Sequence, residues 1–376
     1  MALTILEDIE YIIQYIKENK MKKQFLNLGK QPIANGFLYN DQISNEYFFN
    51  LGVSFDEETK LVTQTEYVDP PLMFNDEYVY QSSGSQTMRD HFANTAAMLS
   101  KKYSPESVLE IGSNDGVFLK NWETSVADSV EPCGNFAVIT NLLGYKPLDN
   151  FWDQDTAKEL DREYDLIYSA NCFCHIHDLQ DAFAAVRLAL SDKGVLVIED
   201  PSLIKMVERC SYDQLYDEHA HIFSVYAISK LAKAAGLKVI GVDELTIHGG
   251  SHRIYIAQDT SLHTVDRSVA NTIYKEKNKG ITSASGLSDF EESVSSSMKK
   301  LTDLFDHLKS DGHKIVSYGA TSKSTTVFNY CGLGTNIFDY IIDTTPDKIG
   351  KYSPGMHIPV LNYPDGIPED VTIAFL

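Results

Sequence analysis

The sequence predicts an α/β protein in which a parallel sheet covered by helices lies between two smaller units. From residue 104 to about residue 258, short apolar runs alternate with helical patterns, as in successive βαβ units. A glycine-rich turn follows the first of these runs, and a second strand–turn–helix–strand pattern begins near residue 314. The 376 residues are enough for two or three domains of ordinary size.

The elements follow in order along the chain. Apolar residues at helical spacing predict an amphipathic helix over residues 3–18 rather than a signal peptide. The sequence up to residue 80 is rich in turn-forming and aromatic residues, which predicts a small domain of short strands. The central strands are expected in SVLEI, DSVEP, YDLIYSA, GVLVIED, LKVIGVDEL and HRIYIA, the last two forming an antiparallel pair at one edge. The polar segment after residue 258 predicts one long helix to about residue 313. The expected domains are therefore 1–88, 89–258 and 259–376.

The composition excludes several functional classes. The net charge of −21 repels polyanions and anionic bilayers, so neither nucleic acid nor a membrane is the expected partner. No apolar run approaches the roughly 20 residues of a membrane span. The five cysteines form no C-x-x-C pair, which argues against a disulfide scaffold or a cysteine-rich zinc module. We expect a cytoplasmic protein with reduced thiols and no metal.

The glycine-rich turn reads Glu-Ile-Gly-Ser-Asn-Asp-Gly over residues 110–116. Its G-x-x-x-G spacing differs from the G-x-G-x-x-G of pyrophosphate binders, and it predicts a tight turn into a following helix. Glu131 lies nineteen residues after Gly112, where a carboxylate can accept hydrogen bonds from ribose hydroxyls. This pairing favours S-adenosylmethionine (SAM) over a plain βα turn with a solvated acid. The expected cofactor-binding residues are Glu110, Gly112, Asn114, Gly116, Glu131, Pro132 and Asn171.

Titratable residues gather after two later strands. His175 and His177 follow YDLIYSA, and an inserted segment after GVLVIED carries Tyr216, Glu218 and His219. We expect His219 to act as a general base, with Tyr216 and Glu218 orienting it. The alternative, that paired histidines bind a metal, lacks a recurring third-ligand spacing.

The C-terminal unit offers a second candidate binding loop. Residues 319–324 follow an expected strand and open a helix, so backbone N–H groups and Lys323 can bind phosphate there. The loop lacks the G-K-[ST] ending of a Walker motif. The alternative is a simple βα turn with a solvated lysine.

Together these motifs resemble the deoxysugar C-methyltransferases, which methylate a ring carbon of nucleotide-linked 4-keto sugars. The resemblance spans nearly the whole chain. It rests on LGKQPIANGF, YVYQSSGSQTMRDHF, EIGSNDG, SANCFCHI, VIEDPSL, YDQLYDEH, HGGSHR, GATSKSTT and DTTPDKIGKYSPGMHIPV. It implies three domains: a small N-terminal domain, a class I SAM-dependent methyltransferase domain of Rossmann-like fold, and a C-terminal Rossmann-like α/β domain that helps to hold the sugar nucleotide. We expect the nucleotide to be dTDP.

The resemblance also implies roles for individual residues. Tyr216 and His219 would abstract a proton, with Glu218 between them. His175 matches an active-site histidine, and Tyr78 or Tyr80 matches a tyrosine at the cleft. These six residues form the expected catalytic set. The expected substrate-binding residues are His248, Gly249, Arg253, Lys323 and Asp343.

Two departures from the family pattern stand out. The family's N-terminal domain usually holds zinc with four cysteines, whereas no cysteine precedes Cys133 here. We expect the helix over residues 3–18 to support that domain instead. Relatives also continue beyond the position of Leu376. Two other functions stay open: a binding protein without activity, and a nicotinamide-dependent oxidoreductase using Asp343, twenty-four residues after Gly319, as its ribose ligand.

Overall fold

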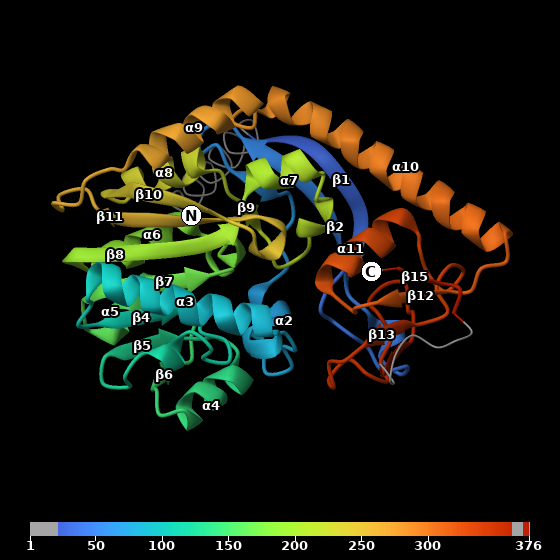
Figure 1. The fold of residues 1–376 in the computed structure, drawn as a ribbon, viewed down its shortest axis with the longest axis horizontal. Helices are drawn as coiled ribbons and strands as arrows, with labels where there is room; N and C mark the ends of the chain where they lie inside the picture. Colours follow the sequence, from blue (N-terminus) through green and yellow to red (C-terminus); the bar gives the residue numbers. More distant parts are fainter. Residues whose placement is uncertain (1–21, 363–370, 376) are drawn as a thin grey trace, which may run out of the picture.

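The computed structural model of the protein describes residues 22–362 and 371–375. These residues form three sheets joined by helices, and the long helix α10 (Ser288–Ser310) runs over the N-terminal sheet to the C-terminal unit (Figure 1). The helix expected over residues 3–18 lies outside the described residues. No described helix combines the length and apolar character needed to cross a membrane.

The central sheet has seven strands in the order β10-β11-β8-β7-β4-β5-β6. β11 is antiparallel to both neighbours, and the other pairs are parallel. The expected strands and the antiparallel edge pair are confirmed, whereas the two-residue strand β6 was not expected. The strands are β4 (Val108–Ile111), β5 (Ala127–Val130), β6 (Pro147–Leu148), β7 (Tyr164–Ala170), β8 (Leu190–Pro201), β10 (Leu237–Leu245) and β11 (Ser251–Gln258).

Helices cover both faces of this sheet, because its central strands are apolar on both sides. Along β7, Leu166 and Tyr168 point into one core and Ile167 into the other, as the alternation of a strand requires. The first core is closed by Phe92 of α3, and the second by Phe183 of α6. The helices of the central region are α3 (Gln86–Tyr103), α4 (Gly134–Leu142), α5 (Gln154–Leu160), α6 (Leu179–Ala189), α7 (Leu203–Arg209) and α8 (Val225–Ala234).

The helix expected directly after the glycine-rich turn is wrong. The chain forms only a short 3-10 helix over Leu119–Asn121 before β5. Gly112, Asn114 and Gly116 all have positive φ, which a right-handed helix excludes. Phe118 is fully buried and stacks on Tyr168, with ring centroids 3.9 Å apart. The segment therefore serves as a buried connection.

The N-terminal sheet is antiparallel, in the order β1-β2-β3-β9, and its fourth strand comes from the central region. β1 (Lys22–Pro32), β2 (Phe48–Asp56) and β3 (Val62–Gln64) are joined by β9 (His221–Ile222), which pairs with β3. The core of this unit takes in side chains from α7 and α10 as well as from β1 and β2. The leading sheet is thus completed by residues that lie more than 150 positions later in the chain.

The single long helix expected up to residue 313 is also wrong, because two helices occupy the segment. These are α9 (Arg267–Lys279) and α10 (Ser288–Ser310). Gly280 ends α9 with a φ of +83°, and the backbone of Gly286 packs directly on that of Gly280. Only glycine allows both the left-handed conformation and so close a contact.

The C-terminal unit is a four-stranded parallel sheet in the order β14-β13-β12-β15. The expected strand–turn–helix–strand pattern is confirmed as β12 (Ile315–Tyr318), α11 (Ser322–Cys331) and β13 (Ile341–Asp343), followed by β14 (Val360–Asn362) and β15 (Ile373–Phe375). The N-terminal segment holds this unit in place. Leu38 and Tyr352 exchange backbone hydrogen bonds, and the carboxylate of Glu46 lies 2.7 Å from Nε2 of His357.

Candidate active site

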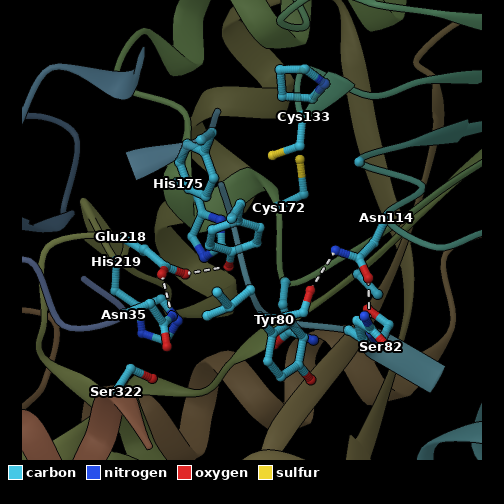
Figure 2. A pocket seen from close by; sticks show the side chains of 18 of the residues that line it. Asn35, Tyr80, Ser82, Asn114, Cys133, Cys172, His175, Glu218, His219 and Ser322 are labelled. Atoms are coloured by element: carbon cyan, nitrogen blue, oxygen red, sulfur yellow. Dashed lines mark hydrogen bonds between the residues drawn. The ribbon is translucent and has the colours of Figure 1, made fainter. Parts of the chain in front are cut away.

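A cavity of about 1050 Å³ opens at the carboxyl ends of β4, β5 and β7, where ligands bind in open α/β sheets. Its other walls come from α2 (Pro70–Met73) with the segment after it, from residues 214–219, and from two loops of the C-terminal unit. All three units therefore contribute to one cavity. Figure 2 shows Glu218 and His219 on one side and Asn114 with Ser82 on the other.

The cofactor side is built from the glycine-rich turn and Glu131. Gly112 has a φ of +73°, and a Cβ there would lie 2.8 Å from Sγ of Cys172, so only glycine fits. The Glu131 carboxylate accepts hydrogen bonds from the N–H groups of Asn114 (2.6 Å) and Cys133 (2.9 Å), one on each oxygen.

Glu131 is 4% exposed and lines the cavity. Burial raises the pKa of its carboxyl, against the two backbone N–H groups that lower it. Each carboxylate oxygen keeps a second lone pair, so Glu131 can still accept ribose hydroxyls. Pro132, Asn114 and Asn171 also line this side. A narrow backbone turn beside a carboxylate that can still accept hydrogen bonds fits a nucleoside. The residues on this side of the cavity therefore fit SAM.

The opposite side holds His219 in one tautomer. Its Nδ1 lies 2.6 Å from the carbonyl oxygen of Gln214, and its Nε2 lies 2.9 Å from the hydroxyl of Tyr216. Because a carbonyl can only accept, Nδ1 carries the proton and Nε2 accepts from Tyr216. Burial, and then the neighbouring His175, lower the pKa of His219 well below 6.5. The ring is therefore neutral and its Nε2 is unprotonated.

Glu218 does not orient His219, and this expectation is corrected. Its Oε1 accepts from Nδ2 of Asn35 at 2.6 Å, and its Oε2 accepts from the Tyr78 hydroxyl at 2.9 Å (Figure 2). Burial raises the pKa of both Glu218 and Tyr78. Tyr216 and Gln214 orient the histidine instead.

His175 and Tyr80 also line the cavity. The ring of His175 stacks on that of His219 with centroids 5.3 Å apart, and its Nε2 has no hydrogen-bond partner among the described residues. Burial lowers the pKa of His175 to about 3, so this ring is neutral too. The Tyr80 pKa is raised to about 12 by burial. Of the two expected cleft tyrosines, Tyr78 is the one that reaches Glu218.

The C-terminal unit brings Lys323 and Asp343 to the cavity, together with His248. Nζ of Lys323 donates to the His248 carbonyl at 3.2 Å, and burial lowers the pKa of this lysine. The Asp343 carboxylate accepts from the N–H groups of Ala320 (2.6 Å) and Thr345 (2.7 Å). Asp343 thus braces two loops of the cavity wall.

Sequence reasoning missed Asn35 and Lys348. Lys348 is 7% exposed, lines the cavity, and donates from Nζ to the Ala320 carbonyl at 2.7 Å, above the ring of Phe37. Among the described residues, Lys323 and Lys348 are the lysines or arginines of the cavity wall. Both missed residues lie inside motifs that carried the family resemblance, but no local pattern marks either one as functional.

Four expected site residues do not line the cavity: Glu110, Gly116, Gly249 and Arg253. The expected substrate contact of Arg253 is corrected, because its guanidinium pairs with the Glu199 carboxylate at 2.6 Å and donates to Oγ1 of Thr95 at 2.7 Å. Glu110 is buried within β4, Gly116 permits the turn with a φ of +72°, and the Gly249 carbonyl accepts from Arg209. The cofactor-binding roles of Glu110 and Gly116 and the substrate-binding role of Gly249 stay predictions.

Within the described part of the chain, one group of side chains is close enough to share a metal ion: Cys174, His175 and His219. Both ring nitrogens of His219 already have partners. Burial raises the pKa of the Cys174 thiol well above its usual value, whereas a metal needs the thiolate. This donor set does not fit a metal ion, and the expectation of a metal-free enzyme stays a prediction.

Three family models match the chain. A methyltransferase domain matches residues 83–242, a C-methyltransferase C-terminal domain matches residues 246–370, and a putative zinc binding domain matches residues 18–74. Residues 18–74 contain neither cysteine nor histidine, so the usual ligands of that zinc are missing here.

The chain is also similar to individual methyltransferases. The C-methyltransferase NovU of Streptomyces niveus is 26% identical over 344 residues, which cover 89% of this chain and 82% of NovU. A SAM-dependent methyltransferase from Clostridium acetobutylicum is 14% identical, with 45% of this chain and 92% of that one covered and a TM-score of 0.37. Magnesium protoporphyrin IX methyltransferase from Synechocystis with bound SAH is 11% identical, with 48% and 90% covered and a TM-score of 0.36.

The three matched ranges follow one another along the chain in the order of the N-terminal, central and C-terminal sheets. The central match contains the glycine-rich turn, Glu131 and His219, and the C-terminal match contains Lys323 and Lys348. On this combination of family matches, the chain belongs to the SAM-dependent C-methyltransferases.

Proposed function

We propose that this enzyme transfers a methyl group from SAM to a ring carbon next to the ketone of a nucleotide-linked 4-keto deoxysugar, carried by dTDP. One observation carries the proposal: an unprotonated imidazole nitrogen, linked to a tyrosine hydroxyl, lies in the same cavity as the SAM-binding turn. Transfer to carbon needs a base, because the C–H proton must leave before a nucleophile exists.

Bound SAM supplies a methyl group on a positively charged sulfur, which is already a strong electrophile. The chain must therefore bind and align it. In the proposal, Gly112 lets the backbone approach the ligand closely, and Glu131 accepts hydrogen bonds from the ribose. Pro132, Asn114 and Asn171 complete this wall. Alignment of two bound substrates contributes several kcal/mol to catalysis.

Tyr216 and His219 carry the proton. As the substrate C–H proton moves to the Tyr216 oxygen, the Tyr216 hydroxyl proton moves to Nε2 of His219 along the 2.9 Å hydrogen bond. The electron pair left on carbon is delocalised onto the ketone oxygen and then forms the new bond to the methyl group. The bond from that methyl group to sulfur breaks at the same time, and its electron pair stays on the departing thioether. The gained proton stays on His219, whose Nδ1–H remains bonded to the Gln214 carbonyl.

The developing negative charge on the ketone oxygen needs a donor. His175 fills this role in the proposal, because its ring stacks on His219 and its Nε2 has no protein partner among the described residues. Tyr78 is already committed to Glu218. A donor of this kind contributes about 10²–10³-fold to the rate.

The nucleotide end would lie against the C-terminal unit. Lys323, Lys348 and the N–H groups at the start of α11 offer positive charge to a diphosphate. Asp343 and His248 would shape the same end of the cavity. A cytoplasmic location, where nucleotide sugars are made, completes the proposal.

The test is transfer of a labelled methyl group from SAM to a panel of dTDP-4-keto sugars. The matched control is each sugar with its ketone reduced to an alcohol, which removes the acidic C–H. We expect label in the keto sugars alone, on a ring carbon identified by NMR. Label on oxygen, or equal labelling of the reduced sugars, would reject the proposal. SAM binding without methyl transfer would favour a binding protein without activity. Reduction of a nicotinamide cofactor would favour an oxidoreductase.

A further inference from the structure

Residues 74–85, here called the strap, connect α2 to α3 and cross the cofactor side of the cavity. The strap carries Tyr78 and Tyr80. Its backbone is bound mainly by side chains of the central unit. Nδ2 of Asn135 donates to the Tyr78 carbonyl at 3.0 Å, and Nδ2 of Asn114 donates to the Tyr80 carbonyl at 3.0 Å.

The far end of the strap is fixed in the same way. The N–H of Ser82 donates to Oδ1 of Asn114 at 2.8 Å (Figure 2). The N–H of Ser83 donates to Oδ2 of Asp115 at 3.0 Å. Asn114 therefore holds the strap with both atoms of its amide. Asn114 and Asp115 belong to the same glycine-rich turn that we assign to SAM.

Asn135 lies in the first turn of α4 and does not line the cavity. The preceding residue, Gly134, shows how closely this turn meets the strap. A Cβ on Gly134 would lie 2.5 Å from Oδ1 of Asp76, so the first turn of α4 lies directly against a side chain of the strap. The Asn135 side chain therefore contacts the Tyr78 carbonyl from outside the cavity. It does not lie where either substrate would bind.

Glu131 connects these contacts. Its two oxygens accept hydrogen bonds from the backbone N–H groups of Asn114 and Cys133. Asn114 itself holds the strap, and Cys133 lies two residues before Asn135, the second asparagine that holds it. At the other end, the Tyr78 hydroxyl donates to Glu218 at 2.9 Å. Hydrogen bonds and short stretches of chain thus link the Glu131 carboxylate to the opposite wall of the cavity.

We propose that Asn135 is a positioning residue that sets the Tyr78 hydroxyl against Glu218, and that the strap, held by Asn114 and Asp115, links this placement to occupancy of the SAM site. The part concerning turnover rests on the proposed function. The part concerning SAM and the strap does not, because it concerns the cofactor site alone. Linkage is reciprocal, so a strap fixed by SAM also favours SAM binding.

Turnover of Asn135→Ala tests the first part. Loss of one hydrogen bond to a positioned group predicts a kcat about 3- to 10-fold lower, with the KM of the sugar nucleotide within about twofold of wild type. The matched control is Asn75→Ala, also on the strap, whose amide makes only local contacts: Nδ2 donates to the carbonyls of Pro71 and Leu72, and Oδ1 accepts from the N–H of Glu77. We expect that control to keep its kcat.

The same change in a Tyr78→Phe background separates positioning from general damage. If Asn135 acts through the Tyr78 hydroxyl, Asn135→Ala has no further effect once that hydroxyl is gone. An unchanged kcat in the single variant, or the same fold loss in both backgrounds, overturns the proposal. Thermal unfolding of each variant confirms that folded protein is compared.

Hydrogen exchange of wild-type protein tests the second part without any sugar substrate. The amides of Ser82 and Ser83 should exchange more slowly when SAM is added, because Asn114 and Asp115 are then held by the bound cofactor. Exchange that does not change with SAM overturns the link. If no keto sugar is methylated but these amides slow, the proposed function fails while the link between SAM and the strap stands.

Discussion

At the scale of single residues, the buried His219 ring is the general base of the proposed function. We predict that His219→Asn slows turnover at least about 100-fold, because no base then receives the proton. SAM binding should persist, since Gly112 and Glu131 are untouched. Comparison of kcat with the SAM dissociation constant checks this. His221→Asn is the matched control: a buried histidine of the same insertion that does not line the cavity. Near-wild-type turnover of His219→Asn would remove His219 from the role.

The pH dependence of activity should reflect the same burial. A general base works unprotonated, and burial lowers the pKa of His219 well below 6.5. The base therefore stays active as the pH falls through the ordinary histidine range. We predict that kcat/KM for the acceptor loses half its value only below pH 6.5. A profile from about pH 5 to pH 8 measures this, and a midpoint at 6.5 would show that the base is exposed to solvent.

The sequence predicted the pair Tyr216 and His219 because they lie three residues apart in one short motif. It misassigned Glu218 for a physical reason. The partners of Glu218, Asn35 and Tyr78, lie 183 and 140 residues away along the chain. Local spacing carries no information about such contacts, which arise only when the N-terminal segment folds over the insertion.

At the scale of elements, apolar runs of four or more residues were enough to predict the main strands of the central sheet. Strands β6 and β9 were missed because two residues are too few to show alternation. The glycine-rich turn was expected to open a helix, but three positive φ angles exclude a helix within the turn, and only a short 3-10 helix follows it. Sequence pattern therefore predicted the layers and failed where backbone conformation or distant pairing decides.

The turn between α9 and α10 gives a prediction at this scale. Gly286→Ala should lower the free energy of unfolding by about 1–3 kcal/mol, because the new Cβ would overlap the backbone of Gly280. Chemical denaturation measures the loss. Ser285→Ala, an exposed neighbour in the same turn, should have little effect. Equal stability of both variants would mean that the turn relaxes without cost.

The N-terminal unit matches a zinc-binding family model without the ligands for zinc. In the described residues, apolar side chains stabilise it instead. Phe49, Leu51, Val53 and Phe55 of β2 are all at most 2% exposed, and they share a core with Phe290 of α10. Burial of such side chains contributes about 1.5–3 kcal/mol each. A small domain that packs on its neighbours in this way can fold without a metal.

At the scale of the whole molecule, the charge of −21 acts on the two substrates in opposite directions. A nucleotide sugar is anionic and is repelled, whereas SAM carries a net positive charge and is attracted. Raising the ionic strength from about 0.01 M to about 0.15 M shortens the screening length from about 30 Å to about 8 Å. We predict that KM then falls for the nucleotide sugar and rises for SAM. Initial rates at constant pH measure both, and a shift of the two constants in one direction would contradict the prediction.

The pairing of β3 with β9 has a consequence for dividing or recombining this enzyme. The strand that closes the leading sheet immediately follows Glu218 and His219 in the chain. A fragment without residues 22–64 would leave β9 unpaired, and a fragment without β9 would expose a bare edge on β3. Exchange of the leading unit between relatives must therefore also carry over the short insertion that contains β9.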